Sequence, residues 1–316
     1  MKTRITEPGV YESIYADNDV VLSTVKDNYD IIIDGLKFLG NRVFKNDNYI
    51  ITSGNEKYLL KIFNMNNNFQ LGNEALILNE LDRNSFVTQK IVKTKNKKHS
   101  FFINGRNAAI FTYIEGCDGR DIILTEEIAK DLGKAHATMH KVLQNIELDT
   151  RGTTRNFDYE KTLALYNKHK GDLGREEIKF FESSLQMNYI PENLEIGIVH
   201  SSVKRLNTIF KDGKFVTFID FDGCYQGKLL LDISNTIAEF FIDKDRVNYE
   251  LMKCYLNSYL EIMPIDISFI QKAIKFSLCR QALKWKIASI GNDFIDEETF
   301  QHYIDCHNLL ENETRF

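Results

Sequence analysis

Two side chains with hard oxygen atoms flank a short hairpin in the second half of the sequence. Asn207 precedes and Asp220 follows a run of mainly apolar residues that turns at Asp212-Gly213. Because Asp-Gly is a preferred pair for a tight hairpin turn, the strands should bring Asn207 and Asp220 close together. An amide oxygen and a carboxylate so placed suit Mg²⁺, which favours oxygen ligands and bridges substrate phosphates. The structural alternative has Asp220 ending a strand and Asn207 capping a turn.

Two histidines form a second group of candidate ligands. His136 and His140 are spaced by one helical turn, which puts both imidazoles on one face of a helix. The segment lacks the glutamate of the His-Glu-x-x-His motif, and no third ligand is evident, so we expect no zinc site there. His302 and Cys306 share this spacing, and we interpret them as a chance pair on a helix.

The elements before residue 113 predict a small sheet. Residues 36–63 alternate short apolar runs with turn clusters, which indicates three strands, the last ending at Lys61-Ile62-Phe63. Apolar residues at helical spacing follow over 74–81. A further hairpin is predicted over 100–111, where Asn104-Gly105 is the pair that a type I′ turn favours. This part should therefore be an antiparallel sheet with one inserted helix.

The remainder of the chain predicts mainly helices. Residues 125–146 carry apolar side chains every three or four positions, with Glu126 and Glu127 in the first turn, where the helix dipole favours anions. Further helical stretches are expected near the C-terminus and over about 157–188, 229–242, 246–262 and 268–290. The hairpin between Asn207 and Asp220 is the β interruption that stands out.

Composition limits the classes of function. The 316 residues are 43% hydrophobic and 27% charged, as in a soluble globular protein with a sizeable core. The net charge of −5 comes without a basic stripe, so nucleic acid is not an expected partner. Five scattered cysteines lack a Cys-x-x-Cys pair and fit a reducing compartment. No apolar run is long enough for a signal peptide or a membrane helix, so we expect a cytoplasmic protein without membrane contact.

The segment from His200 to Asp222 resembles the catalytic region of the aminoglycoside phosphotransferase and choline kinase-like family, relatives of the protein kinases. In that family a His-Gly-Asp-x-x-x-x-Asn motif is followed by a hairpin and Ile-Asp-Phe/Trp-Asp/Glu. Ten residues after Asp222, the sequence Asp232-Ile233-Ser234 is similar to the Asp-Leu-Ala that begins a helix in the family. The matching positions of the motif, in order and spacing, are His200, Asn207, Ile219, Asp220, Phe221 and Asp222. The resemblance implies that Asn207 and Asp220 hold Mg²⁺.

The same resemblance implies a nucleotide site. Lys61 looks like the lysine that pairs with the α- and β-phosphates of ATP or GTP, and Glu74 looks like its ion-pair partner. The alternative for Lys61 is a solvated lysine at a strand end. Ile114-Glu115-Gly116 resembles the hinge whose backbone binds adenine. A complete G-x-G-x-x-G is missing, so the nucleotide loop is either the turn at 45–48 or degenerate.

One departure from the family pattern concerns the chemical step. The catalytic aspartate of the motif, which accepts the proton of the attacking hydroxyl, is Ser202 here, and Ser201 replaces the glycine. A serine can orient a hydroxyl by hydrogen bonding but is no base near pH 7. Three explanations are open: an engineered substitution, a slow or unusual kinase, and a pseudokinase that binds nucleotide without transferring phosphate.

The resemblance implies a two-lobed α+β fold of the protein-kinase type, with a nucleotide-binding lobe over 1–113 and a helical catalytic and acceptor-binding lobe over 114–316. It also implies transfer of a phosphoryl group from ATP or GTP to a hydroxyl of a small molecule such as an aminoglycoside, amino-alcohol or sugar. The alternative is a silent pseudokinase that regulates a partner. The oligomeric state stays open. A cationic acceptor would suit the acidic residues after Asp232, although a solvated face is the commoner explanation for them: Asp243, Asp245, Glu250, Glu261, Asp293, Asp296, Glu297 and Glu298.

Overall fold

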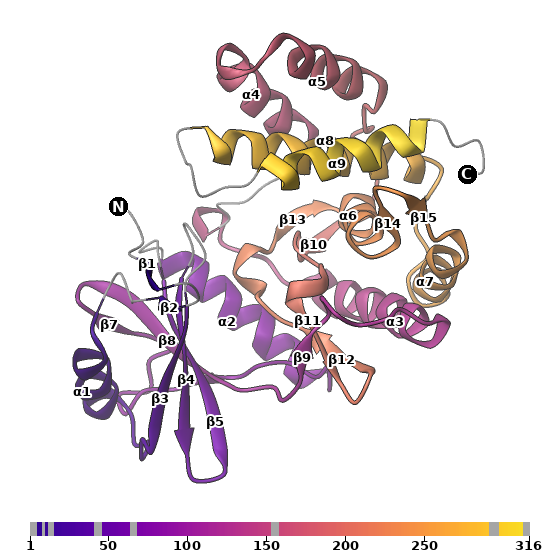
Figure 1. Ribbon diagram of the computed structural model, residues 1–316. Helices are drawn as coiled ribbons and strands as arrows, with labels where there is room; N and C mark the ends of the chain where they lie inside the picture. The colour runs from indigo at the N-terminus through magenta and orange to yellow at the C-terminus, as the bar shows by residue number, and fades with distance from the viewer. Residues whose placement is uncertain are drawn as a thin grey trace. The chain divides into compact units, whose positions relative to one another are not determined.

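The computed structural model describes residues 5–7, 10–11, 16–40, 46–63, 68–152, 158–290 and 297–311. The chain divides into two compact units, Met1–Glu115 and Gly116–Phe316. The first is built on an antiparallel sheet and the second is mainly helical (Figure 1), which confirms the predicted α+β class. The turn at 45–48, one of the two possibilities for the nucleotide loop, lies partly outside the described residues.

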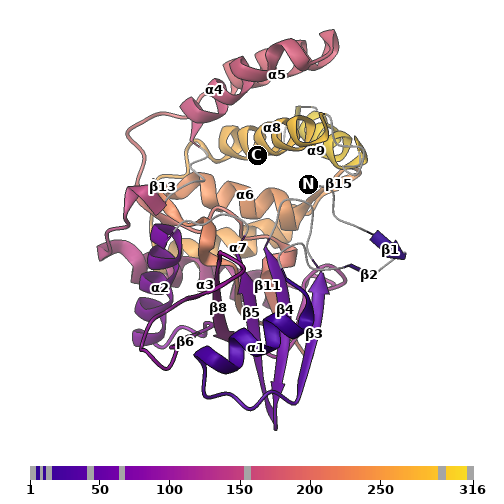
Figure 2. The ribbon, with the colours of Figure 1, turned by 90° about the vertical axis from the view of Figure 1, so that its left-hand side faces the viewer.

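The first unit contains a sheet of six strands with helices on both faces. Its strands run in the order β3 (Gly35–Gly40), β4 (Asp47–Ser53), β5 (Glu56–Ile62), β8 (Arg106–Thr112) and β6 (Ile91–Val92), with β7 (Phe101–Ile103) also paired to β8. Strands β1 (Ile5–Glu7) and β2 (Val10–Tyr11) pair separately. Helices α1 (Asn18–Asn28) and α2 (Asn68–Arg83) lie on opposite sides of the sheet (Figures 1 and 2).

The predicted turn chemistry accounts for the hairpin of β7 and β8. Asn104 and Gly105 both have positive φ, 46° and 75°, as a type I′ turn requires. Helix α1 was not predicted. Asp17 caps its N-terminus, since the carboxylate accepts the N–H of Val20 at 2.9 Å, and the helix buries Val21 and Val25 against the sheet.

The second unit packs helices around two small sheets. Strands β10 (Ile196–Val199) and β13 (Tyr225–Lys228) pair with each other, and β12 (Lys214–Phe218), β11 (Thr208–Lys211) and β9 (Cys117–Asp118) form the other sheet. A short hairpin joins β14 (Ile242–Asp243) to β15 (Arg246–Val247). The helices are α3 (Glu126–Val142), α4 (Tyr159–His169), α5 (Arg175–Met187), α6 (Leu229–Phe241), α7 (Tyr249–Ile262), α8 (Ile270–Ser289) and α9 (Glu297–Glu311).

Two predicted helical stretches differ from the structure in detail. The stretch over 157–188 is two helices, because a 3₁₀ turn at Lys170–Asp172 ends the first and Gly174 caps the second. Helix α7 begins three residues later than expected, since β15 first returns the chain against β14.

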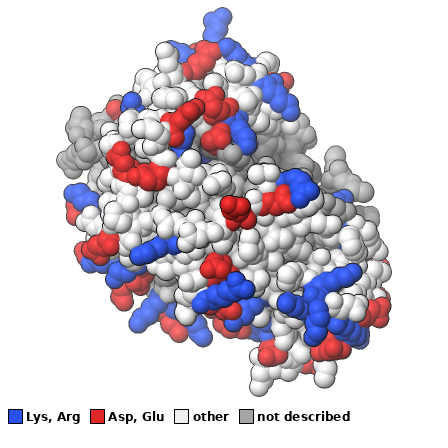
Figure 3. All heavy atoms as spheres, turned by 180° about the vertical axis from the view of Figure 1, so that it is seen from behind, with Lys and Arg blue, Asp and Glu red and all other residues white. Residues whose placement is uncertain are grey.

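The surface carries mixed charge. On the face shown in Figure 3, Lys and Arg side chains lie among Asp and Glu side chains. Within the described part of the chain, no helix combines the length and the apolar character needed to cross a membrane.

Candidate active site

The hairpin of β11 and β12 brings Asn207 and Asp220 to neighbouring positions. Thr208 pairs with Phe218 at the open end of the hairpin, and the N–H of Ile219 donates to the carbonyl oxygen of Asn207 at 2.9 Å. Asp220 follows in the left-handed region, with φ of 71°. The sequence-predicted approach of these two residues is therefore present, while their role as metal ligands stays a prediction.

The side chain of Asn207 is oriented by the loop that precedes it. Its Nδ2 donates to both the carbonyl oxygen and the Oγ of Ser202, each at 3.0 Å. The amide is 7% exposed, so these bonds fix its orientation in a largely buried place. Because Nδ2 is engaged with the loop, Oδ1 is the atom left to bind a cation.

A single carboxylate anchors the loop that carries Ser202. Asp232, in the first turn of α6, accepts the backbone N–H of His200 at 2.7 Å through Oδ2 and that of Ser201 at 2.8 Å through Oδ1. The imidazole Nε2 of His200 lies 3.1 Å from the carbonyl oxygen of Ile219 and donates to it. His200 therefore links the loop to the strand end that leads into Asp220.

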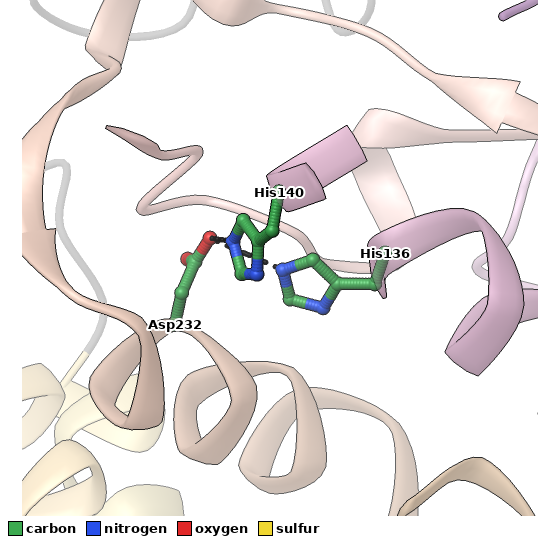
Figure 4. Close-up of side chains that lie close together, drawn as sticks. All are labelled: His136, His140 and Asp232. Atoms are coloured by element: carbon green, nitrogen blue, oxygen red, sulfur yellow. Dashed lines mark hydrogen bonds and ion pairs between the residues drawn. The ribbon is translucent and has the colours of Figure 1, made fainter. Parts of the chain in front are cut away.

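The same carboxylate receives two histidines from α3 (Figure 4). The Nε2 atoms of His136 and His140 each lie 3.1 Å from Oδ2 of Asp232. Their Nδ1 atoms each lie 2.7 Å from a tyrosine hydroxyl, that of Tyr255 for His136 and that of Tyr259 for His140. Because a carboxylate can only accept, Nε2 of each imidazole donates to Asp232.

Burial controls the protonation of this cluster. The side chains of His136, His140 and Asp232 are fully buried. Burial and the neighbouring His140 lower the pKa of His136 to about 4. Burial acts to raise the pKa of Asp232, but hydrogen bonds from the two histidines hold it well below its usual range. The carboxylate therefore stays ionised while it holds the loop.

The third potential ligand beside His136 and His140 is Asp232, so the sequence interpretation that none is available was wrong. It was missed because Asp232 is 92 residues from His140 in the chain. The ring nitrogens of both histidines have hydrogen-bond partners, so the cluster is satisfied without a cation. We interpret it as a structural network.

The contact of the two tyrosines with the histidines was not predicted, although their spacing in the sequence indicates it. Tyr255 and Tyr259 repeat the one-turn spacing of His136 and His140 on a helix packed against α3. Gly133 allows close packing, because a Cβ there would lie 2.2 Å from the carbonyl oxygen of Tyr255. Two matched i, i+4 pairs beside a helical glycine therefore indicate adjacent helices.

In the first unit, Lys61 and Glu74 form an ion pair. The Nζ of Lys61 on β5 lies 3.7 Å from Oε1 of Glu74 on α2, and the two residues are only 6% and 4% exposed. Leu60 and Ile62 belong to the core beside α1, so strand alternation turns Lys61 toward α2. The alternative of a solvated strand-end lysine is wrong.

Glu115 lies apart from that pair. It is exposed and accepts a 2.9 Å ion pair from Lys57, whose pKa is raised by the hydrogen bond to Glu115. The predicted contact of this hinge with adenine concerns the backbone and stays a prediction. The other acidic residues suggested for an acceptor are exposed where the structure describes them, which favours a solvated face: Asp243, Asp245, Glu250, Glu261 and Glu298. Asp293 and Asp296, and the side chain of Glu297, lie outside the described residues.

Comparison with known proteins supports the resemblance. Homoserine kinase from Neisseria meningitidis is 20% identical over 226 residues, 70% of this chain and 72% of the relative. Homoserine kinase from Methylobacillus flagellatus is 22% identical, over 70% of this chain and 68% of the relative.

Solved structures show the same fold. An amicoumacin kinase in complex with AMP-PNP and Ca²⁺ superposes with a TM-score of 0.73 at 17% identity and covers 95% of each chain. A microcompartment-associated aminopropanol kinase gives a TM-score of 0.68 at 16% identity, covering 93% of this chain and 97% of the other. The predicted kinase-like fold is thereby confirmed.

The family itself follows from a match over most of the sequence. Residues 40–260 match the model of the phosphotransferase enzyme family. The matched range contains Lys61, Glu74 and the whole segment from His200 to Asp232. These findings favour a small-molecule phosphotransferase over a silent pseudokinase. The chain belongs to the phosphotransferase enzyme family.

Proposed function

We propose that this phosphotransferase transfers the γ-phosphoryl group of Mg-ATP to a hydroxyl of an amine-bearing small molecule, and that Lys61, Glu74, Asn207 and Asp220 form its nucleotide and metal machinery. The observation that carries the proposal is the buried ion pair of Lys61 and Glu74. Burying two charges is costly, and a pair that served only the fold could be replaced by apolar residues. A lysine held in this way can pair with phosphates at a fixed position.

The donor set around the hairpin suits a divalent cation. Asn207 would supply Oδ1, since its Nδ2 is bonded to Ser202, and Asp220 would supply its carboxylate. When bound, Mg²⁺ would neutralise charge on the β- and γ-phosphates. Asp232 fixes the backbone of the loop before Asn207, and His200 donates to the carbonyl oxygen of Ile219, next to Asp220. These bonds hold the two proposed ligands in place.

Ser202 occupies the position that faces the acceptor hydroxyl in the family motif. Its Oγ accepts from Asn207, so its own hydrogen is available to donate to the acceptor oxygen. This arrangement can orient the hydroxyl but cannot take its proton. Phosphoryl transfer has a loose transition state that depends mainly on positioning and electrostatic stabilisation, so we propose a slow enzyme.

The acceptor proposal rests on the kinds of molecule that similar proteins use and on a cavity in the second unit. Two of the similar proteins are named for homoserine and aminopropanol, which both carry an amine and a hydroxyl. The residues around a cavity of about 310 Å³ include three acidic residues, two tyrosines and one lysine: Asp158, Glu160, Glu192, Tyr159, Tyr189 and Lys228.

The chemistry of this cavity suits an ammonium group. The rings of Tyr159 and Tyr189 meet edge to face with centroids 5.1 Å apart, and aromatic faces and carboxylates both attract cations. Gln226, which also lines the cavity, pairs with Ile198 on the strand that leads directly into His200. We therefore propose that this cavity holds an ammonium group of an acceptor long enough to reach Ser202, such as an aminoglycoside.

A phosphotransfer assay tests the proposed function. The unmodified protein is incubated with γ-labelled ATP and Mg²⁺ and a panel of amino-alcohols, aminoglycosides and sugars. We expect slow, Mg²⁺-dependent labelling of an amine-bearing acceptor above the rate of ATP hydrolysis. Labelling of neutral sugars alone would contradict the acceptor class, and the absence of any labelled product would contradict transferase activity.

A further inference from the structure

Ser201 has a backbone conformation that favours glycine. Its φ of 64° lies in the left-handed region, where a Cβ is unfavourable and where glycine is free to lie. The family motif has glycine at this position, so the serine adds strain that the fold must tolerate. Strain of this kind persists only where surrounding contacts determine the conformation, and it marks residues with a role.

Two hydrogen bonds determine the conformation of Ser201. Its N–H donates to Oδ1 of Asp232 at 2.8 Å, and its Oγ donates to the carbonyl oxygen of Gly223 at 3.0 Å. Ser201 is 9% exposed, so solvent competes little for these bonds. The second bond depends on the side chain and could not be made by glycine.

The bond from Oγ joins two segments that carry different parts of the chemistry. We call residues 200–202 the acceptor loop and residues 220–223 the metal segment. Gly223 ends the 3₁₀ turn that follows Asp220, and it lies directly after Asp222. The hydroxyl of Ser201 therefore ties the backbone next to Ser202 to the backbone next to Asp222.

We propose that Ser201 is a positioning residue that holds the acceptor loop against the metal segment through its hydroxyl. The proposal rests on the proposed function, in which Ser202 faces the acceptor and Asp220 binds the metal. An enzyme without a general base depends more strongly on the relative placement of acceptor, phosphate and metal. A side-chain bond between the two segments restricts their relative motion, and the chain acquires this bond at the same place where it lacks the aspartate.

Two substitutions separate the bond from the backbone strain. Ser201→Ala keeps the Cβ in the left-handed region and removes the bond, whereas Ser201→Gly removes both the bond and the strain. Ser277→Ala is the control, because Ser277 is a buried serine whose hydroxyl bonds Ser234, a residue outside both segments. We expect kcat to fall about tenfold in both Ser201 variants, the typical effect of one lost positioning bond, while the KM for ATP changes less than twofold. The control should keep its kcat.

A purely structural role predicts a different pattern. Ser201→Gly would then be at least as stable and as active as the unmodified protein, and Ser201→Ala alone would lose stability and activity. An unchanged kcat in Ser201→Gly therefore overturns the proposal.

Amide hydrogen exchange tests the link without turnover. Exchange across residues 220–224 should become several-fold faster in both Ser201 variants and stay unchanged in Ser277→Ala. Unchanged exchange in the Ser201 variants overturns the proposal. A lack of turnover by the unmodified protein on every acceptor would count against the phosphotransferase function, and the exchange result would still decide whether Ser201 links the segments.

Discussion

The residues that we propose to bind nucleotide and metal match the family motif, whereas the acceptor loop departs from it. Lys61 and Glu74 form a buried pair, and the hairpin places Asn207 beside Asp220. In the acceptor loop, Ser201 and Ser202 stand where the family has glycine and aspartate. The first set of groups would bind charge on the nucleotide, and the second would act on the acceptor hydroxyl. The contrast predicts that nucleotide binding and the chemical step can be changed independently.

The largest expected effect comes from restoring the carboxylate of the acceptor loop. Ser202→Asp should raise turnover by about 100-fold or more, because general-base catalysis contributes about 10² to 10⁴. A carboxylate can also accept the bond that Asn207 donates to Oγ, so the loop should keep its place. Initial rates and the Kd of Mg-ATP are measured for both forms, with Ser202→Ala as the control that removes the hydroxyl only.

The affinity for Mg-ATP should stay within twofold in both Ser202 variants. If Ser202→Asp binds Mg-ATP and turns over as slowly as the unmodified protein, the missing general base is not the only reason for slow turnover. If the serine form is already fast, another residue supplies the base.

A second substitution tests the nucleotide groups. Lys61→Met combined with Glu74→Gln removes both charges without leaving one buried and unpaired. Nucleotide affinity should fall about tenfold to 100-fold, the scale of a lost charge-assisted bond. Lys57→Met is the control, since Lys57 lies on the same strand but is exposed and pairs with Glu115. Equal affinities in the double variant and the control would assign the buried pair to the fold alone.

A third prediction concerns the histidine cluster and pH. The folded pKa of His136 is about 4, below its ordinary value of 6.5, so the unfolded chain binds a proton that the folded chain does not. His136 alone should therefore lower the free energy of unfolding by about 2 kcal/mol from pH 7.5 to pH 5. Burial also lowers the pKa of His307 to about 4, so His307 adds a loss of the same sign over this range. The pKa of Asp232 lies well below its ordinary value of 3.8 in the folded chain, so this residue lowers the free energy of unfolding only at more acidic pH.

Urea unfolding at several pH values measures this dependence. His136→Gln keeps an N–H donor toward Asp232 and does not titrate. The free energy of unfolding of this variant should therefore change less between pH 7.5 and pH 5. A variant with the same pH dependence as the parent would show that His136 is not the group responsible.

The smallest expected effect is at the proposed amine site. Glu160→Gln should raise the KM of an amine-bearing acceptor by up to about fivefold, as one partly solvated charge pair contributes up to about 1 kcal/mol. It should leave the KM of ATP unchanged. Glu176→Gln, on the neighbouring helix α5 and outside this cavity, is the matched control. Equal acceptor KM values in the two variants would remove this cavity from the acceptor site.

Turn pairs and helical periodicity made most of the fold predictable. Asn104-Gly105 and Asp212-Gly213 both take positive φ at each residue, as their turn types require. Helix α3 begins at Thr125, the residue that the acidic first turn indicated. Helix α1 was missed because its buried face is narrow, with Val21 and Val25 in the core.

The candidate site was predictable only where residues lie near one another in the sequence. The hairpin places Asn207 beside Asp220 by local geometry. The contact of Asp232 with His136 joins α6 to α3 across 96 residues of the chain, and no local pattern specifies it. The burial of Lys61 depends in the same way on α2 covering its side of the sheet. Tertiary packing therefore decides which of the candidate polar residues are buried and paired.

The measurement that tests the central claim most directly is calorimetric titration of Mg-ATP into the unmodified protein and into Asp220→Asn. The substitution keeps the size of the side chain and removes the charge that would bind the cation. We expect saturable binding that requires Mg²⁺ and that the substitution weakens about 100-fold or more, while the thermal stability of the free protein changes much less. Mg²⁺-independent binding, or equal binding by both proteins, would contradict the account that Asp220 and its hairpin form the metal end of a phosphotransferase site.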